Sequence, residues 1–167
     1  MSTITVVPAK PEEKNLVANL LQLYLHDFSE IEALETNEEG VFDYRDFESF
    51  WNQPDHYIFI ARYENRAVGF AFVQRGFHHE KKDRHDEQLI DMVEFFVLRR
   101  YRRKGVGYAM ALHCFHTFPG KWQVRTDEAN PGGAAFWKRV ITDFSKNRFE
   151  AFHPIAFPGT TYYFESP

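Results

Sequence analysis

Eleven residues in the middle of this chain read Val97-Leu98-Arg99-Arg100-Tyr101-Arg102-Arg103-Lys104-Gly105-Val106-Gly107. A strand-like apolar run ends where they begin, basic residues follow, and two glycines open a helical segment. The first N–H groups of a helix lack internal partners, and the helix dipole adds positive charge at the same end. Glycine has no Cβ to keep an anion away from the backbone. These residues therefore predict a cradle for a pyrophosphate group.

The spacing of the glycines excludes two common phosphate loops. A Walker loop requires Gly-Lys-Ser/Thr after four spacer residues, and the chain has no such sequence here. The dinucleotide fingerprint requires a third glycine at position 110, where the chain has Met110. What remains is Arg-x-x-Gly-x-Gly, from Arg102 to Gly107.

The elements around this loop predict a mixed α/β fold. Residues 89–98 have strand composition, residues 105–118 have helical composition, and a short strand follows at 122–124. That succession is long enough for a right-handed crossover between parallel strands. The other expected elements are a strand at 4–7, a helix from Pro11, a short helix capped by Asp43, strands at 57–60 and 67–74, a helix from Pro131 to about Ile141, and strands at 149–152 and 162–164. The order is β-α-α-β-β-β-α-β-α-β-β.

Composition places the chain among globular proteins. Its 167 residues are 44% hydrophobic, which fits a single domain over 1–167 with a substantial core. Cys114 is the only cysteine, so an internal disulfide and a cysteine zinc cluster are excluded. The sequence contains neither a spanning apolar run nor a secretory signal, which predicts a cytoplasmic protein without a membrane partner. A net charge of −4 disfavours nucleic-acid binding.

The Arg102–Gly107 spacing resembles the pyrophosphate loop of the GNAT superfamily of N-acetyltransferases. The longer family form, Val-x-Pro-x-Tyr-Arg-x-Lys-Gly-x-Gly, matches Val97–Gly107 except that Arg99 replaces the proline. The resemblance implies a mostly antiparallel sheet of about seven strands with about four helices. It implies an acyltransferase that moves an acetyl group from acetyl-CoA to a primary amine by direct attack. The acceptor would be a small molecule or peptide, and the protein a monomer or homodimer.

The resemblance also implies which residues contact acetyl-CoA. Backbone groups of Phe95, Phe96 and Val97 would face the pantetheine and the thioester. Asn130, at the start of the next helix, matches a family asparagine that contacts the CoA arm, although it is also an ordinary helix cap. The pyrophosphate would be held by the N–H groups of Arg103, Lys104, Gly105, Val106, Gly107 and Tyr108, with charge added by the side chains of Arg102 and Arg103.

Two carboxylates are candidates for the general base, because many family members use one on the strand before the glycine loop. Glu94 lies within the apolar run Met92-Val93-Glu94-Phe95-Phe96. Apolar surroundings raise the pKa of a carboxyl group, which suits a base. Asp91, nearer the start of the strand, is the second choice. The alternative for Glu94 is a side chain that points outward from a strand.

The general acid of the family is usually a tyrosine seven residues after the asparagine, where this chain has Trp137. Solvent remains as a proton source, as do the four tyrosines Tyr101, Tyr108, Tyr162 and Tyr163. The tryptophan also leaves open a non-catalytic acyl-CoA-binding domain. The five basic residues between Arg99 and Lys104 leave open a phosphate or nucleic-acid binding module.

Two polar segments have no defined role at this point. The first contains His78, His79, Glu80, Asp83, His85, Asp86 and Glu87, and we interpret it as a solvated loop rather than a metal site. The second contains Glu30, Glu32, Glu35, Glu38 and Glu39. It is either an ordinary polar loop or an acidic rim that favours a cationic acceptor.

Overall fold

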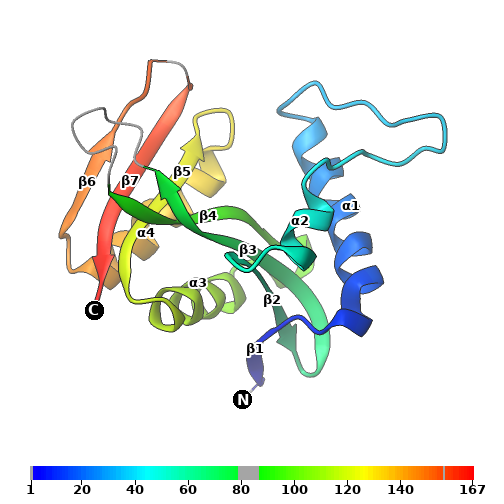
Figure 1. The fold of residues 1–167 in the computed structure, drawn as a ribbon, viewed down its shortest axis with the longest axis horizontal. Helices are drawn as coiled ribbons and strands as arrows, with labels where there is room; N and C mark the ends of the chain where they lie inside the picture. Colours follow the sequence, from blue (N-terminus) through cyan, green and yellow to red (C-terminus); the bar gives the residue numbers. More distant parts are fainter. Residues whose placement is uncertain (1, 79–86, 156) are drawn as a thin grey trace. The chain divides into compact units, whose positions relative to one another are not determined.

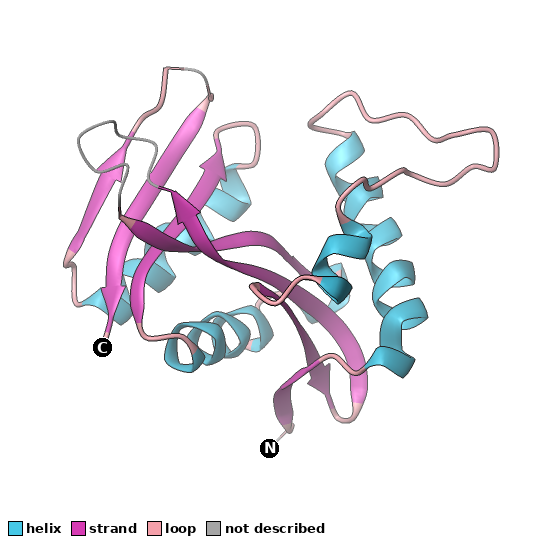
Figure 2. Cartoon of the chain, in the orientation of Figure 1, coloured by secondary structure: helices cyan, strands magenta, loops and turns pink. Residues whose placement is uncertain are grey.

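The structure, a computed structural model, describes residues 2–78, 87–155 and 157–167. Seven strands form one sheet in the order β1-β2-β3-β4-β5-β7-β6 (Figures 1 and 2). The strands are β1 (Ile4–Pro8), β2 (His56–Tyr63), β3 (Arg66–His78), β4 (Gln88–Val97), β5 (Gly120–Asp127), β6 (Phe149–Phe152) and β7 (Gly159–Ser166). The helices are α1 (Lys14–Ser29), α2 (Phe47–Asn52), α3 (Val106–Thr117) and α4 (Pro131–Ser145), with short 3-10 turns η1 (Pro11–Glu13) and η3 (Arg99–Tyr101). The predicted element order and mixed fold class are confirmed.

Two compact units make up the chain. The first comprises Met1–Phe72 and Glu94–Met110, and the second comprises Val73–Val93 and Ala111–Pro167. Strands β3 and β4 and helix α3 each contribute residues to both units. The predicted glycine loop and Glu94 therefore belong to the first unit, whereas Asp91 and Asn130 belong to the second.

In the first unit, β1 and β2 pair in antiparallel register from Ile4↔Tyr63 to Pro8↔Phe59. A tight turn at Glu64 and Asn65 joins β2 to β3, as the sequence predicts. Both residues have positive φ, 49° and 66°, which is the conformation a two-residue hairpin turn requires.

Helix α1 packs its buried face against aromatic residues of the same unit. The Tyr24 ring lies 5.8 Å from Phe70 of β3 and 5.9 Å from Phe96 of β4, both edge-on. Phe50 of α2 lies 4.5 Å from Phe72. Edge-on and tilted aromatic pairs add to the stabilisation from burial, so this cluster fixes α1 and α2 over the strands.

In the second unit, β4 and β5 are parallel, with register Ile90↔Trp122 to Met92↔Val124. This confirms the predicted crossover through α3. Strand β7 pairs antiparallel with β5 and with β6. The core is centred on Phe115 of α3, whose ring lies 4.9 Å from Trp122, 5.0 Å from Phe144 and 4.9 Å from Phe164.

The short helix starts later than the sequence predicts. It begins at Phe47 after the N-cap Asp46, and not directly after Asp43. The Asp43 carboxylate instead accepts a hydrogen bond from Asn37 Nδ2 at 3.0 Å, which holds the preceding loop. A side chain used in this way cannot cap a helix, so the prediction at Asp43 is wrong.

Cys114 is fully buried in α3, as expected from its apolar neighbours. Burial raises the pKa of its thiol to about 12, so the thiol stays protonated and is not a nucleophile. Among the described residues, none of the helices combines the length and the apolar character needed to cross a bilayer.

Gly69 of β3 is required by a close approach of two strands in the first unit. A Cβ at this position would lie 2.4 Å from the carbonyl oxygen of Phe96 in β4 and 3.3 Å from Cα of Val97. Both neighbours are backbone atoms, which cannot move aside without shifting the strand. Glycine therefore allows β4 to approach β3 at the point where β4 reaches the glycine loop.

We expect Gly69→Ala to lower the free energy of unfolding by about 2 kcal/mol, because the added methyl overpacks the β3–β4 contact. Gly132→Ala is the matched control. Its Cβ would meet only Asn130 Oδ1 at 3.9 Å, an ordinary contact inside α4. Alanine should be neutral there or stabilise the helix by up to about 1 kcal/mol. Urea unfolding of both variants measures the difference, and equal stabilities would contradict the close approach.

Candidate active site

The glycine loop presents a row of unused backbone donors in the first unit. Helix α3 begins at Val106. The carbonyl of Gly105, the residue before it, accepts a hydrogen bond from the N–H of Ala109 at 2.9 Å. Within the described residues, no backbone carbonyl accepts a hydrogen bond from the N–H groups of residues 103–108. Six adjacent donors at a helix start are suited to an anion with several oxygens.

The backbone of the loop requires glycine at one position. Gly105 has φ +83°, which L side chains rarely adopt, and a Cβ there would meet only Ile4 Cδ1 at 3.8 Å. The conformation, rather than lack of space, thus selects glycine. Arg103 also has a positive φ of 60°, so the chain turns sharply twice before α3 begins.

An acidic residue of α1 holds this loop. Asp27 accepts hydrogen bonds from Arg99 Nε at 3.0 Å and from Arg102 Nη2 at 2.6 Å. Arg102 Nε also donates to the carbonyl of Val97 at 2.8 Å. The Arg102 guanidinium therefore joins the end of β4, the loop and α1. We call Asp27, Arg99 and Arg102 the loop clip.

The pKa of Asp27 reflects the clip. Burial alone would raise this pKa, but the hydrogen bonds and charges of Arg99 and Arg102 outweigh burial and lower it. The carboxylate therefore stays ionised at neutral pH, and the clip stays closed.

Glu94 of β4 is held by two tyrosine hydroxyls in the same unit. Tyr24 of α1 donates a short hydrogen bond to Oε2, and Tyr44, in the loop before α2, donates to Oε1 at 2.9 Å. Both oxygens of the carboxylate are thus oriented from the helical side. The Glu94 side chain is only partly buried. It does not point freely into solvent, which was the alternative left open by the sequence.

Both tyrosines remain donors over the whole physiological range. Burial, followed by the charge of Glu94, raises the pKa of Tyr24 well above its ordinary value. The same two causes, in the same order, raise the pKa of Tyr44. Since neither phenol ionises near neutral pH, Glu94 is always the acceptor in these two hydrogen bonds.

Phe95, Phe96 and Val97 follow Glu94 in β4 and lead directly into the loop. Phe96 and Val97 are buried, and Phe95 is half-buried. All three follow Met92 of β4, and the register between β4 and β5 runs from Ile90↔Trp122 to Met92↔Val124. The N–H of Leu98 bonds to the carbonyl of Val68 at 2.8 Å, which fixes the end of β4 against β3.

Asp91, the second predicted base, lies in the second unit and is 1% exposed. Its carboxylate accepts from Arg125 Nη2 at 2.5 Å and from Gln123 Nε2 at 3.1 Å. A buried carboxylate needs such partners, because leaving it unpaired costs several kcal/mol. The arrangement gives Asp91 a structural ion pair with Arg125.

Asn130 and Trp137 also lie in the second unit. Asn130 is the N-cap of α4 and accepts from the N–H of Gly133 at 2.9 Å, as expected for Asn before Pro. Trp137 is buried beside Phe115, with ring centroids 6.4 Å apart, so it is part of the core.

The four tyrosines considered as proton donors have different surroundings. Tyr101 lies in the first unit, with its ring 5.5 Å from Tyr63. Tyr108 is half-buried in the first turn of α3. Tyr162 and Tyr163 are buried in β7 of the second unit, and burial raises the pKa of Tyr162. Neither hydrogen bond to Glu94 comes from this set.

A metal centre gains no support from the described part of the chain, where no group of His, Cys, Asp and Glu is arranged to hold an ion. Most of the histidine-rich segment predicted as a solvated loop, residues 79–86, lies outside the described residues.

The sequence profile described as the Acetyltransferase (GNAT) family matches residues 17–141, which is most of the chain. The chain belongs to the GNAT acetyltransferase family. The matched region contains the glycine loop, Glu94 and the loop clip. Among curated proteins, none matches the sequence of this GNAT domain significantly.

Solved acetyltransferase structures share the fold of this GNAT domain. An acetyltransferase from Thermus thermophilus has a TM-score of 0.63 at 18% identity, covering 96% of this chain and 95% of that one. The ribosomal-protein-S18-alanine N-acetyltransferase of Escherichia coli has a TM-score of 0.60 at 11% identity, and the match covers 98% of this chain and 94% of that one. A third structure is that of an aminoglycoside acetyltransferase from an uncultured soil metagenomic sample, in complex with sisomicin. Its TM-score is 0.59 at 17% identity, and the match covers 91% of this chain and 96% of that one.

Sequence reasoning missed Asp27, Tyr24 and Tyr44 as partners of the predicted site. Tyr24 occupies an apolar stripe of α1, and Tyr44 belongs to an aromatic run, so both resemble core residues. The hydroxyl groups of these two tyrosines could have indicated a polar partner, because a buried tyrosine hydroxyl needs a hydrogen bond. Glu94, the acid within an apolar strand, was the candidate for that partner.

We expect Asp27→Asn to lower the free energy of unfolding by about 1–2 kcal/mol at pH 7, since it weakens two charge-assisted hydrogen bonds. Because the native pKa of Asp27 is lowered, its contribution is present above the unfolded pKa of about 3.9. It is lost as the pH falls through the native value.

Urea unfolding at pH 7 and pH 3 measures this difference. Asp143→Asn is the control, because its pair with Arg139 is exposed and 3.9 Å long, and it should change stability by less than about 0.5 kcal/mol. A difference for Asp27→Asn that does not shrink between pH 7 and pH 3 would exclude ionisation of Asp27 as its cause.

Proposed function

We propose that this GNAT domain transfers the acetyl group of acetyl-CoA to a primary amine by direct attack, with Glu94 as the general base. The observation that carries the proposal is the presence, in one compact unit, of six unused loop donors and a carboxylate oriented by two tyrosines. The first suits an anionic cofactor and the second suits proton transfer.

The residues of the loop fit the pyrophosphate of acetyl-CoA. The N–H groups of Arg103, Lys104, Gly105, Val106, Gly107 and Tyr108 would hold it, because these donors have no backbone acceptor among the described residues. Backbone groups of Phe95, Phe96 and Val97 are proposed to line the pantetheine, and Asn130 to contact the CoA arm. Arg102 would act through the loop clip. Acetyl-CoA supplies the activated acetyl group as a thioester.

Glu94 would accept a proton from the ammonium form of the acceptor, directly or through a water molecule, and so produce the nucleophilic amine. Its two tyrosine partners keep the carboxylate in one orientation, which general-base catalysis requires. Asp91 is a weaker candidate because it is 1% exposed, whereas Glu94 is only half-buried, and because its charge is already paired with Arg125.

We infer that α4 supplies no general acid, because it contains no tyrosine and the indole N–H of Trp137 is too weak an acid to protonate a thiolate. A thiolate is a good leaving group with an ordinary pKa near 8.5, and it can take its proton from solvent.

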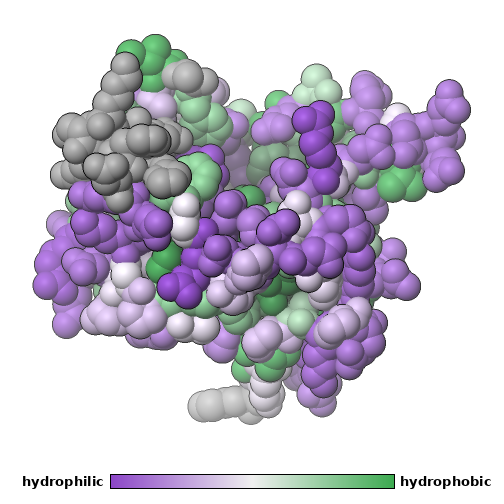
Figure 3. All heavy atoms as spheres, in the orientation of Figure 1, coloured by the Kyte–Doolittle hydropathy of each residue, from purple (hydrophilic) through white to green (hydrophobic). Residues whose placement is uncertain are grey.

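The acceptor is proposed to carry positive charge. Five glutamates between α1 and α2, in residues 30–39, are all exposed. Figure 3 shows the surface over this loop as mainly hydrophilic. The charge of Glu32 contributes to the raised pKa of Tyr24, so this acidic segment acts on the surroundings of Glu94. An acidic rim attracts a cationic amine from solution.

The direct experiment is a screen of amines with acetyl-CoA that measures the release of free thiol. The panel should contain polyamines, aminoglycosides, amino acids and peptides with free N-termini. Turnover with cationic amines that falls as ionic strength rises would support the proposal. Binding of acetyl-CoA without turnover of any amine would leave only a non-catalytic acyl-CoA-binding role.

Replacing the base tests the catalytic assignment. We expect Glu94→Gln to lower kcat by about 10²–10⁴-fold, because the amide cannot accept the proton. The affinity for acetyl-CoA should change less than twofold. Glu12→Gln, an exposed residue of η1, is the control and should leave both quantities unchanged. Wild-type kinetics of Glu94→Gln across the pH range would remove Glu94 as the base.

Blocking the loop tests the cofactor assignment. We expect Gly107→Val to raise the Kd for acetyl-CoA about tenfold or more, because a branched side chain would stand among the loop donors. Ala109→Val is the control. It places the same side chain in the same helix, at a residue whose N–H already bonds to Gly105. Equal affinities of the two variants would contradict the assigned loop.

A further inference from the structure

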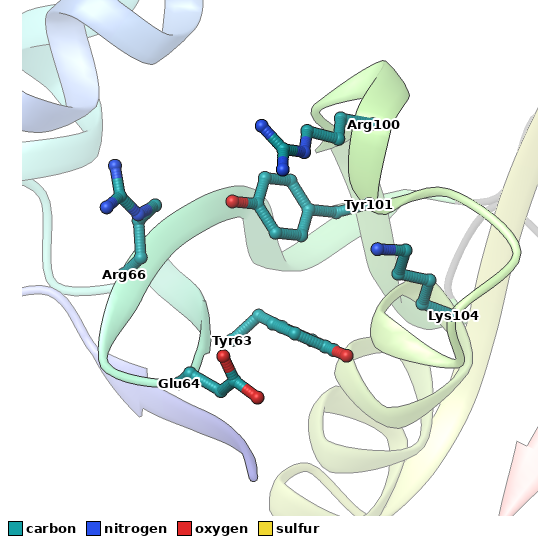
Figure 4. Close-up of a pocket in the computed structure, with 6 residues that line it drawn as sticks. All are labelled: Tyr63, Glu64, Arg66, Arg100, Tyr101 and Lys104. Atoms are coloured by element: carbon teal, nitrogen blue, oxygen red, sulfur yellow. The ribbon is translucent and has the colours of Figure 1, made fainter. Parts of the chain in front are cut away.

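A second basic site lies in the first unit beside the glycine loop. It is a pocket of about 350 Å³ lined by Tyr63, Glu64, Arg66, Arg100, Tyr101 and Lys104. Figure 4 shows the side chains of Arg66, Arg100 and Lys104 arranged around the two tyrosine rings. Its residues come from the end of β2, the turn after it and the start of β3, from η3 and from the loop. We call it the hairpin pocket.

The tyrosine rings fix one cation of the hairpin pocket. Lys104 Nζ lies 5.5 Å from the centroid of Tyr63 and 5.5 Å from that of Tyr101. The two rings lie 5.5 Å from each other, so they form a single surface for the ammonium group. Cation–π contacts hold the position of a charge without neutralising it. Lys104 therefore presents a full positive charge to the pocket.

The hairpin pocket has an excess of positive charge. Arg66, Arg100 and Lys104 face one carboxylate, that of Glu64. In the described part of the chain, none of the three cations forms an ion pair. This differs from Arg99 and Arg102, which are neighbours in sequence but are both paired with Asp27. Two arginine forks and an ammonium, opposed by a single carboxylate, are the donors that bind phosphate oxygens.

We propose that the hairpin pocket binds a phosphate monoester, as a site separate from the one that holds acetyl-CoA. A phosphate monoester carries close to two negative charges at neutral pH and three acceptor oxygens, which match three cations and one carboxylate. The pocket volume is within the range of small-molecule sites. The proposed cofactor contact uses the backbone N–H of Lys104, whereas the hairpin pocket uses its side chain.

The test is a titration of the ¹⁵N-labelled chain with glycerol 3-phosphate and with inorganic phosphate, followed by NMR. Sodium chloride at equal ionic strength is the comparator. Each titration is done with and without saturating acetyl-CoA, so that occupation of the glycine loop is controlled. We expect saturable shifts of the amide signals of Glu64, Arg66 and Arg100 in both conditions, and no saturable shift with chloride.

Variants locate the site. The double variant Arg66→Ala/Arg100→Ala should weaken glycerol 3-phosphate binding about fivefold or more, because two of the three cations are removed. Arg45→Ala is the matched control, since it removes an exposed arginine of the same unit outside the pocket and should leave the affinity unchanged. Glu64→Gln should strengthen binding about twofold, because it removes the opposing charge. A misfolded variant cannot produce that gain.

Three results would overturn the proposal. The first is equal affinity of the wild type and the double variant for glycerol 3-phosphate. The second is loss of the shifts when acetyl-CoA is present, which would show that the cofactor, through its pyrophosphate or its own ribose phosphate, occupies the same site. The third is a Glu64→Gln variant that binds more weakly than the wild type. Failure of acetyl-CoA itself to bind would contradict the proposed function. The hairpin pocket would then be tested by the phosphate titration done in the absence of acetyl-CoA.

Discussion

The first unit is organised around a constraint on its backbone: within the described residues, the N–H groups of residues 103–108 have no backbone acceptor. Such groups are costly where protein covers them and useful where an anion can reach them. The chain keeps them available by two sharp turns, at Arg103 and Gly105, and by starting α3 at Val106. Asp27 then fixes the turn from outside through Arg99 and Arg102.

The basic stretch before the glycines therefore has several uses. Arg99 and Arg102 are paired with Asp27 and maintain the shape of the loop. Arg100 and Lys104 point into the hairpin pocket. We propose that an anion at the loop is bound chiefly by backbone donors, which are fixed in place and do not lose side-chain entropy when a ligand binds. The charge of the stretch indicates phosphate chemistry, but two of its five basic side chains are paired with Asp27.

The carboxylate proposed as the general base lies on β4, the strand that leads into this loop. Gly69 allows β4 to approach β3 closely, and the strand then carries Glu94 two residues before Phe96 on the side of α1. There the hydroxyls of Tyr24 and Tyr44 meet its two oxygens. A polar group within an aromatic cluster is stable only with such partners. The core packing of α1 and the orientation of the proposed base are thus one arrangement.

Most of the fold could be predicted from the sequence, because strand composition, glycine and proline punctuation and the Asn130-Pro131 cap are local signals. The glycine loop was predictable for the same reason. The start of α2 was not, since the side chain of Asp43 binds Asn37 across the loop instead of capping a helix. The partners of Glu94 and of Arg102 were also beyond a sequence pattern, because they lie 50 to 75 residues away in the chain. Such contacts depend on how α1 packs, and a tyrosine in an apolar stripe does not reveal which acid it meets.

We propose that the backbone donors of residues 103–108 form a site for coenzyme A. Calorimetric titration of the whole chain with acetyl-CoA, free CoA and ATP tests it most directly. We expect saturable binding of both CoA forms and binding of ATP at least about tenfold weaker, because the loop and β4 are proposed to contact the pantetheine as well as the pyrophosphate. Absence of CoA binding at millimolar ligand, or equal binding of ATP, would contradict it.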